Sequence, residues 1–185
     1  MALRATVYKA EINVADNDRG YYGSHAVTVA RHPSETDERL MVRLLAYALY
    51  ADGDDGLTFT RGLSETDEPD LWRQDLTGTI EQWVETGLPD ERRLLKACGR
   101  ADEVIVFAYG RNAGAWWSGV QGKVARARNL KVYILPADAT QALAALARRT
   151  MTLHVNVQDA TAWVSSDDGS VSLDVTALDR AATAG

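Results

Sequence analysis

The sequence predicts an α+β protein in which a mixed β-sheet is flanked by helices and each end of the chain adds an antiparallel hairpin. The two hairpins are expected to pair with each other into one antiparallel sheet. Two observations carry this prediction. In the middle of the chain, the uninterrupted apolar runs 104–109 and 131–135 enclose a helical stretch at 115–128, as in a parallel strand-helix-strand crossover. Towards both ends, short segments alternate apolar and polar residues on either side of loops rich in Asp, Asn and Gly, which is typical of hairpins.

The first elements are a hairpin and a well-marked helix. Segments 6–14 and 24–30 predict two strands joined by a loop of turn-forming residues. A helix over 35–50 follows, with Ser34 as its expected N-cap and a carboxylate three residues later, at the capping-box position. Its apolar face is formed by residues at helical spacing: Met41, Leu44, Leu45, Ala48 and Leu49.

The remaining elements follow from the same patterns. Further strands are predicted at 57–60, 71–75, 79–86, 152–157, 161–165 and 171–175. A helix capped by Asp90 and a second one over 138–149 complete the expected set. The first of these helices directly follows strand 79–86, so its opening turn should lie at the end of that strand.

Composition places limits on the class of protein. With 185 residues and 46% apolar residues, the chain can bury a core as one domain over 1–180, with 181–185 expected to be a disordered tail. The formal charge of −6 argues against indiscriminate nucleic-acid binding, which depends on phosphate neutralisation. A single cysteine, Cys98, excludes an internal disulfide. Because no segment resembles a signal peptide or a membrane span, we expect a cytoplasmic protein that does not bind membranes, and a monomer is favoured.

The segment 83–96 is the most informative for chemistry. It is typical of a strand that delivers a carboxylate, Glu85, then a tight exit, then a helix that carries Lys96. A metal-dependent phosphodiesterase needs such a pair, because the carboxylate holds Mg²⁺ or Mn²⁺ and the ammonium stabilises charge on the phosphate. The same residues also fit an ordinary strand–helix junction with a solvated helix face.

The order helix, three strands, helix, strand, with acids on the second and third strands, resembles the core of the PD-(D/E)XK nuclease-like (restriction-endonuclease-like) fold. A further resemblance extends over nearly the whole chain and is carried by the stretches 1–10, 31–39, 59–63, 67–69, 88–93, 96–98 and 149–153. In these stretches the chain resembles the YaeQ family of bacterial proteins. The resemblance implies a compact variant of the nuclease-like fold.

Carried over residue by residue, the resemblance places Glu85 at the acidic position of the (D/E)XK element. Gly87 stands where that element has its lysine, and Lys96 on the following helix is the expected substitute. Asp75 is the first choice for the acid of the second strand. Asp70 competes with it, because pairing of the two strands about their turn would place Asp70 directly across from Glu85.

Glu38 and Glu81 complete the predicted metal ligands. Glu38 lies on the inward face of the first helix, from which related nucleases often supply a glutamate. Glu81 shares a strand face with Glu85 but lies roughly 13 Å from it, so only one of the two should bind a given ion. The predicted catalytic residues are Asp75, Glu85 and Lys96, and the predicted ligands of Mg²⁺ or Mn²⁺ are Glu38, Asp75, Glu81 and Glu85.

Two functions follow as expectations. The first is a Mg²⁺-dependent nuclease-like protein that acts on or binds nucleic acid, with phosphate contacts from Arg92, Arg93, Lys123, Arg126 and Arg128. The alternative is a non-catalytic nucleic-acid- or protein-binding module of the same fold, whose carboxylates form a polar structural cluster. Gly87 at the lysine position and the negative net charge favour the alternative, and divalent-metal binding separates the two.

Overall fold

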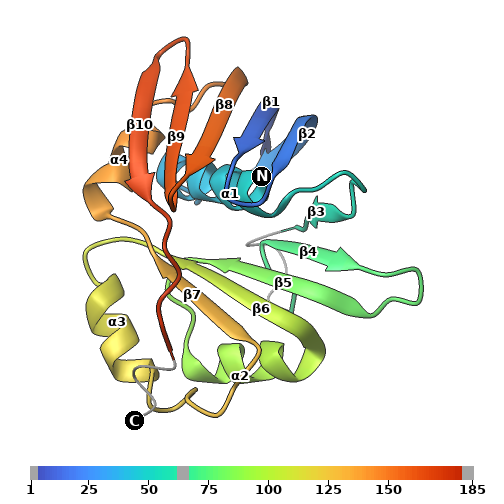
Figure 1. The fold of residues 1–185 in the computed structure, drawn as a ribbon, viewed down its shortest axis with the longest axis vertical. Coiled ribbons are helices and arrows are strands. Elements are labelled where there is room, and N and C mark those ends of the chain that lie inside the picture. Colours follow the sequence, from blue (N-terminus) through green and yellow to red (C-terminus); the bar gives the residue numbers. More distant parts are fainter. Residues whose placement is uncertain (1–3, 62–66, 181–185) are drawn as a thin grey trace.

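A computed structural model describes residues 4–61 and 67–180, and it contains two five-stranded sheets with helices between and outside them (Figure 1). The predicted disordered tail, 181–185, lies outside these residues. The α+β class and the mixed central sheet agree with the sequence prediction. In the described parts of the chain, no helix combines the length and apolar character needed to cross a membrane.

The first sheet joins the two ends of the chain. Its strands are β1 (Thr6–Asp16), β2 (Tyr21–Arg31), β8 (Thr150–Gln158), β9 (Thr161–Ser166) and β10 (Gly169–Asp174), in the order β10-β9-β8-β1-β2. The terminal hairpins pair with each other as expected, but the expectation of a fully antiparallel sheet was wrong. Strands β1 and β8 run parallel, since the chain returns through a helix before β8 begins beside β1.

The second sheet carries the predicted site. Its strands are β3 (Leu57–Phe59), β4 (Leu71–Gln74), β5 (Ile80–Thr86), β6 (Ala101–Ala108) and β7 (Leu130–Ile134), in chain order. β3, β4 and β5 pair antiparallel, and β5, β6 and β7 pair parallel. Helices α2 (Glu91–Arg100) and α3 (Ala113–Val120) cover the outer face of this sheet (Figure 1).

Helix α1 (Asp37–Tyr50) is the centre of the molecule. All ten residues from 40 to 49 are buried, although only one face was predicted to be apolar. A helix buried on every side needs neighbours on every side, and α1 packs on β1 of one sheet, on β5 of the other, and on helix α4 (Ala137–Ala144). The inner faces of both sheets therefore share one core with α1.

The beginning of α1 differs from the prediction. The N-cap is Thr36, whose hydroxyl accepts a hydrogen bond of 3.1 Å from the Arg39 amide, rather than Ser34. Glu35 consequently lies outside the helix, where its amide donates to the His32 carbonyl oxygen at 2.8 Å and the residue is 4% exposed.

Replacement of the cap tests this assignment. Thr36→Ala should lower the free energy of unfolding by about 1 kcal/mol, because one amide of the first helical turn loses its acceptor. Thr36→Ser keeps that acceptor and should lose much less. Thermal unfolding followed by circular dichroism measures the difference, and Ser34→Ala is the matched control. A larger loss for Ser34→Ala than for Thr36→Ala would contradict the cap.

Candidate carboxylate site

The predicted site lies at the carboxyl end of β5, the end at which parallel sheets commonly place ligands. Glu85 and Thr86 are the last residues of the strand. The chain leaves through Gly87, whose φ of 103° favours glycine and whose amide donates to the Phe107 carbonyl oxygen at 3.0 Å. Gly87 therefore provides the backbone conformation with which the chain leaves β5. It stands at the position where the nuclease pattern has a lysine.

Glu85 is buried, with 5% of its surface exposed. Its Oε1 accepts hydrogen bonds from Trp83 Nε1 at 2.9 Å and from Arg93 Nε at 2.8 Å. Burial raises the pKa of Glu85 to about 7, and the charge of Asp70 adds to the rise. The Arg93 guanidinium and the hydrogen bonds from Trp83 and Arg93 oppose this shift without cancelling it.

Asp70 is the acid that accompanies Glu85. The pairing of Leu71 with Val84, continued by one residue, brings Asp70 opposite Glu85. Asp70 is 3% exposed, and its Oδ2 accepts the Thr86 amide at 2.7 Å and the Thr86 hydroxyl at 2.9 Å. Its Oδ1 accepts a hydrogen bond from Arg39 Nη2 of helix α1.

Asp75, the first choice from the sequence, does not approach Glu85. It begins the exposed β4–β5 turn, roughly 16 Å along the strand from Asp70. Its Oδ1 accepts hydrogen bonds from the Thr77 hydroxyl at 2.6 Å, the Thr77 amide at 2.8 Å and the Thr79 amide at 2.9 Å, and these bonds lower the pKa of Asp75. The carboxylate therefore closes the turn, and the placement of Asp75 beside Glu85 was wrong.

Lys96 was also misplaced. Its ammonium binds Asp67 Oδ1 at 3.1 Å, and the two side chains are 63% and 76% exposed. The cation beside Glu85 is Arg93, one turn earlier on α2, which also donates to the Glu68 carbonyl oxygen at 2.7 Å. Because Asp90 caps α2, Arg93 lies in its first turn next to the strand end, whereas Lys96 lies farther along the helix.

The other two predicted metal ligands lie in different parts of the structure. Glu81 is exposed on β5. Glu38 is half-buried, and its Oε2 accepts a hydrogen bond of 2.9 Å from the Thr140 hydroxyl, which links α1 to α4. Within residues 4–61 and 67–180, no group of three or more His, Cys, Asp or Glu side chains is arranged to hold a metal ion.

Sequence reasoning missed the burial of a third carboxylate, Glu35, and its pairing with Arg43. Glu35 accepts two hydrogen bonds of 2.9 Å from Arg43, whose residue is 1% exposed, and lies 3.8 Å from Arg39 Nη1. A signal for this pair was present, since Arg43 is the single charged residue within the buried run 40–49. A buried arginine needs a carboxylate close by.

These side chains form what we call the six-residue network: Glu35, Asp70, Glu85, Arg39, Arg43 and Arg93. It contains three acids and three arginines, so its charges balance when Glu85 is ionised, above its pKa of about 7. A divalent ion between Asp70 and Glu85 would compete with Arg39, Thr86 and Arg93 for the same oxygens. The residues present therefore do not fit a resident Mg²⁺ or Mn²⁺ ion without displacement of an arginine.

Comparison with known proteins gives a consistent result. The family model described as YaeQ protein matches residues 1–175. The "Uncharacterized protein YaeQ" of Escherichia coli (strain K12) is 49% identical over 179 residues, which cover 96% of this chain and 97% of that protein. Its counterpart from Salmonella typhi is 50% identical over the same length, with the same coverage of both chains.

Two solved structures are similar in fold. The crystal structure of YaeQ protein from Xanthomonas axonopodis pv. citri has a TM-score of 0.90 and 51% identity, and the match covers 94% of this chain and 97% of that chain. The YaeQ protein from Pseudomonas syringae has a TM-score of 0.89 and 37% identity, covering 95% and 98% of the two chains.

Proposed function

The chain belongs to the YaeQ family, and we propose that it is a non-catalytic protein-binding module whose nuclease-like carboxylates serve as a structural cluster. A relation to the PD-(D/E)XK fold is part of this proposal. It is supported by the order α1, β3, β4, β5, α2, β6 and by the acids at the start of β4 and the end of β5. The family assignment made from the sequence is confirmed.

The observation that supports the proposal most strongly is the balance of positive and negative charges in the six-residue network. Each carboxylate of the network has an arginine within 4 Å: Arg43 for Glu35, Arg39 for Asp70 and Arg93 for Glu85. Buried charges are tolerated when they are paired and hydrogen-bonded in this way. A hydrolytic metal centre instead needs carboxylates whose negative charge is left for the ion.

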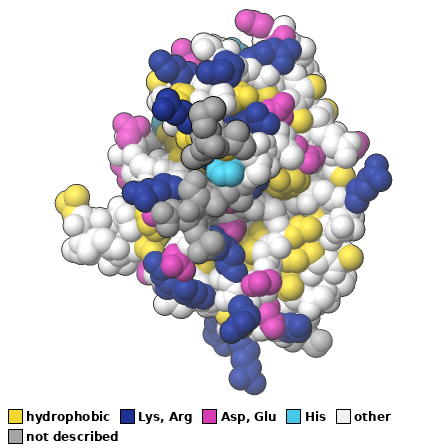
Figure 2. Space-filling model, turned by 180° about the vertical axis from the view of Figure 1, so that it is seen from behind, with side chains coloured by type: hydrophobic (Ala, Val, Ile, Leu, Met, Phe, Trp, Pro, Cys, Tyr) yellow, Lys and Arg dark blue, Asp and Glu magenta, His cyan; other side chains and the backbone are white. Residues whose placement is uncertain are grey.

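Charge also favours a protein partner over nucleic acid. Among the predicted phosphate contacts, Arg93 is held by Glu85, and Lys123 Nζ lies 3.8 Å from Glu91. Among the described side chains on one face of the molecule, Figure 2 shows Lys and Arg interspersed with Asp and Glu. With a net charge of −6, the protein offers little of the phosphate neutralisation that sustains nucleic-acid affinity.

A Mg²⁺-dependent nuclease is the second candidate, and one observation favours it. Asp70 and Glu85 come together at a strand end, and the pKa of Glu85, about 7, suits proton transfer at neutral pH. For this activity, Arg39 or Arg93 would have to leave its carboxylate when the metal arrives.

Metal titration tests the proposal. Calorimetric addition of Mg²⁺ or Mn²⁺ to the full chain should give no saturable binding, and labelled single- and double-stranded DNA and RNA should stay intact. The variant Glu85→Gln should behave like the wild type in both assays, and so should the exposed control Glu81→Gln. Saturable Mg²⁺ binding and metal-dependent cleavage, both lost in Glu85→Gln but kept in Glu81→Gln, would establish the nuclease instead.

A further inference from the structure

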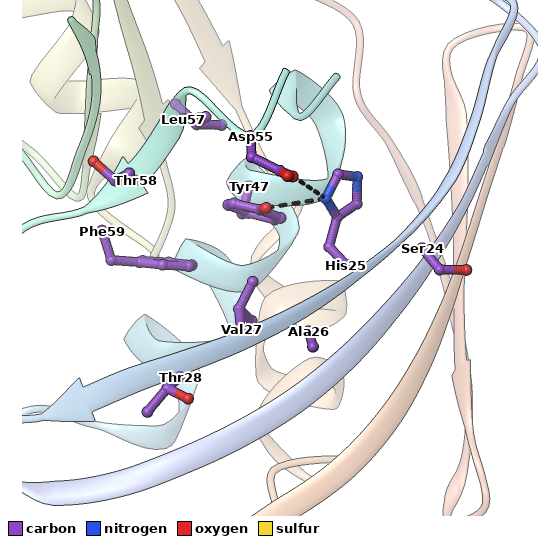
Figure 3. Close-up of a pocket in the computed structure, with 10 residues that line it drawn as sticks. All are labelled: Ser24, His25, Ala26, Val27, Thr28, Tyr47, Asp55, Leu57, Thr58 and Phe59. Atoms are coloured by element: carbon purple, nitrogen blue, oxygen red, sulfur yellow. Dashed lines mark hydrogen bonds and ion pairs between the residues drawn. The ribbon is translucent and has the colours of Figure 1, made fainter. Parts of the chain in front are cut away.

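A cleft of about 510 Å³ lies between the free edges of the two sheets (Figure 3). Residues 24–28 of β2 form one wall and β3 forms the other, with Tyr47 of α1 and Asp55 completing the lining. No member of the six-residue network lines it. Its volume is within the range of small-ligand and peptide sites.

Backbone pairing shows which atoms of β2 face outward. The Lys9 amide of β1 donates to the carbonyl oxygen of Arg149, the residue before β8. The backbone groups of the odd-numbered residues of β1 therefore face β8, and those of the even-numbered ones face β2. Ile12 is paired with His25, which makes the odd-numbered residues of β2 the hydrogen-bonded ones. In agreement, the Ala30 carbonyl oxygen faces away from β1 and accepts Arg43 Nη2 at 3.1 Å.

The amides and carbonyls of Ser24, Ala26 and Thr28 therefore point out of the sheet edge. Among the strands described, β2 has β1 as its partner on one side and no strand on the other. Proteins usually protect such edges with Lys, Pro, a bulge or a short strand. β2 has 11 residues in unbroken register with β1, and it contains no Lys or Pro. This edge is a template for another strand.

The side chains next to this edge indicate which side chains an added strand should have. His25 and Val27 point from β2 towards the rings of Tyr47 and Phe59, whereas Ser24 points away (Figure 3). The Tyr47 and Phe59 rings are stacked, with centroids 5.3 Å apart and planes 15° from parallel. Tyr47 is buried and Phe59 is half-buried, so an aliphatic or aromatic side chain of a ligand can pack against this stack mainly through Phe59.

The other end of the cleft is polar. His25 contacts the Tyr21 hydroxyl at 2.7 Å through Nε2 and the Tyr47 hydroxyl at 3.2 Å through Nδ1, and this nitrogen lies 3.7 Å from Asp55 Oδ1. The Asp55 side chain is 88% exposed. Its acidic neighbours in the same loop, Asp52 and Asp54, are instead paired with Arg73. Asp55 thus offers an open carboxylate to a basic side chain.

We propose that this cleft binds an extended peptide segment of a partner protein by strand addition to β2. The segment pairs with the outward groups of Ser24, Ala26 and Thr28, places an apolar side chain on the Tyr47–Phe59 stack, and places a Lys or Arg beside Asp55. The occupant is an extended segment of another protein, because the outward backbone groups of β2 match an extended chain and the exposed carboxylate of Asp55 matches a basic side chain. The inference rests on the proposed binding function and assigns that function to this cleft.

A library of twelve-residue peptides displayed on phage tests the inference. Selection on the wild-type full chain should enrich sequences with Lys or Arg two or four positions from an apolar residue, because alternate side chains of a strand share a face. Ala26→Pro removes one outward amide, and proline is tolerated at that position of an edge strand. Synthetic selected peptides should bind this variant at least about tenfold more weakly by fluorescence anisotropy.

Two further variants keep the test decisive. Asp55→Lys leaves the β2 backbone untouched and should also weaken binding about tenfold, because a basic ligand side chain then meets a like charge. Ser172→Pro is the matched control, since it removes an outward amide from β10, the opposite edge of the same sheet. It should leave the affinity unchanged.

Three results would overturn the inference: no enrichment above the empty support, selected peptides that bind all variants equally, or a wild-type dimer that Ala26→Pro converts to monomer. The last would assign the edge to a second copy of the chain. These failures are separable from failure of the proposed function. If no peptide binds and Mg²⁺ binding and cleavage are absent too, the inference about the cleft fails and the non-catalytic assignment stands. Conversely, metal-dependent cleavage would refute the proposed function whether or not the selected peptides bind.

Discussion

Arg43→Met is expected to lower the free energy of unfolding by about 3–5 kcal/mol, the largest effect of any single substitution considered for this protein. The methionine fills much of the volume of the arginine but leaves the Glu35 carboxylate buried without its two 2.9 Å hydrogen bonds. Arg39 Nη1, at 3.8 Å, is too far from Glu35 to replace them. Urea denaturation followed by circular dichroism measures the loss.

The double variant Glu35→Leu with Arg43→Met should recover most of that stability. With both partners apolar, no charge remains buried, and such replacements are often neutral or stabilising. Lys96→Ala is the matched control at an exposed ion pair and should change stability by less than about 1 kcal/mol. An Arg43→Met loss as small as that of Lys96→Ala would show that the buried pair does not contribute to stability.

The second large effect is on the pH dependence of stability. The pKa of Glu85 is raised from 4.5 in the unfolded chain to about 7 in the folded protein, because the carboxylate is buried close to Asp70. The folded state thus holds this proton more tightly than the unfolded state. The resulting stabilisation is fully present below pH 4.5 and is lost as the pH rises to about 7.

Glu85→Gln should remove this dependence. The variant and the wild type should be similar in stability near pH 4.5, and the variant should be more stable by about 3 kcal/mol at pH 8. Urea denaturation at half-unit pH steps measures the difference, with Glu81→Gln as the exposed control. If the difference between Glu85→Gln and wild type does not grow with pH, then Arg93 holds Glu85 ionised at all these pH values.

Much of the fold could be predicted because it depends on short-range patterns. The Asp90 cap located α2, and the apolar run 104–109 after it located β6, since capping and burial act within a few residues. The limits of α1 were less certain. Thr36 and Ser34 are both good caps, and the choice between them depends on whether Glu35 can reach a buried partner.

The site was less predictable, because it depends on strand register and helix phase. Asp70 and Asp75 both border β4, and the pairing of Leu71 with Val84 decides which of them faces Glu85. Arg93 and Lys96 are three residues apart on α2, but only Arg93 reaches back to the strand end. Neither choice can be made from residue types alone, since both alternatives have suitable chemistry.

The sequence by itself determined the family, the order of the elements and the position of Glu85 at a strand end, because these follow from local identity and periodicity. The tertiary structure alone decided that Glu35 and Arg43 meet, that β1 runs parallel to β8, and that β2 is an edge strand among the described strands. These features join segments far apart in the chain. Long-range packing sets their geometry, and it also gives each buried acid an arginine of its own.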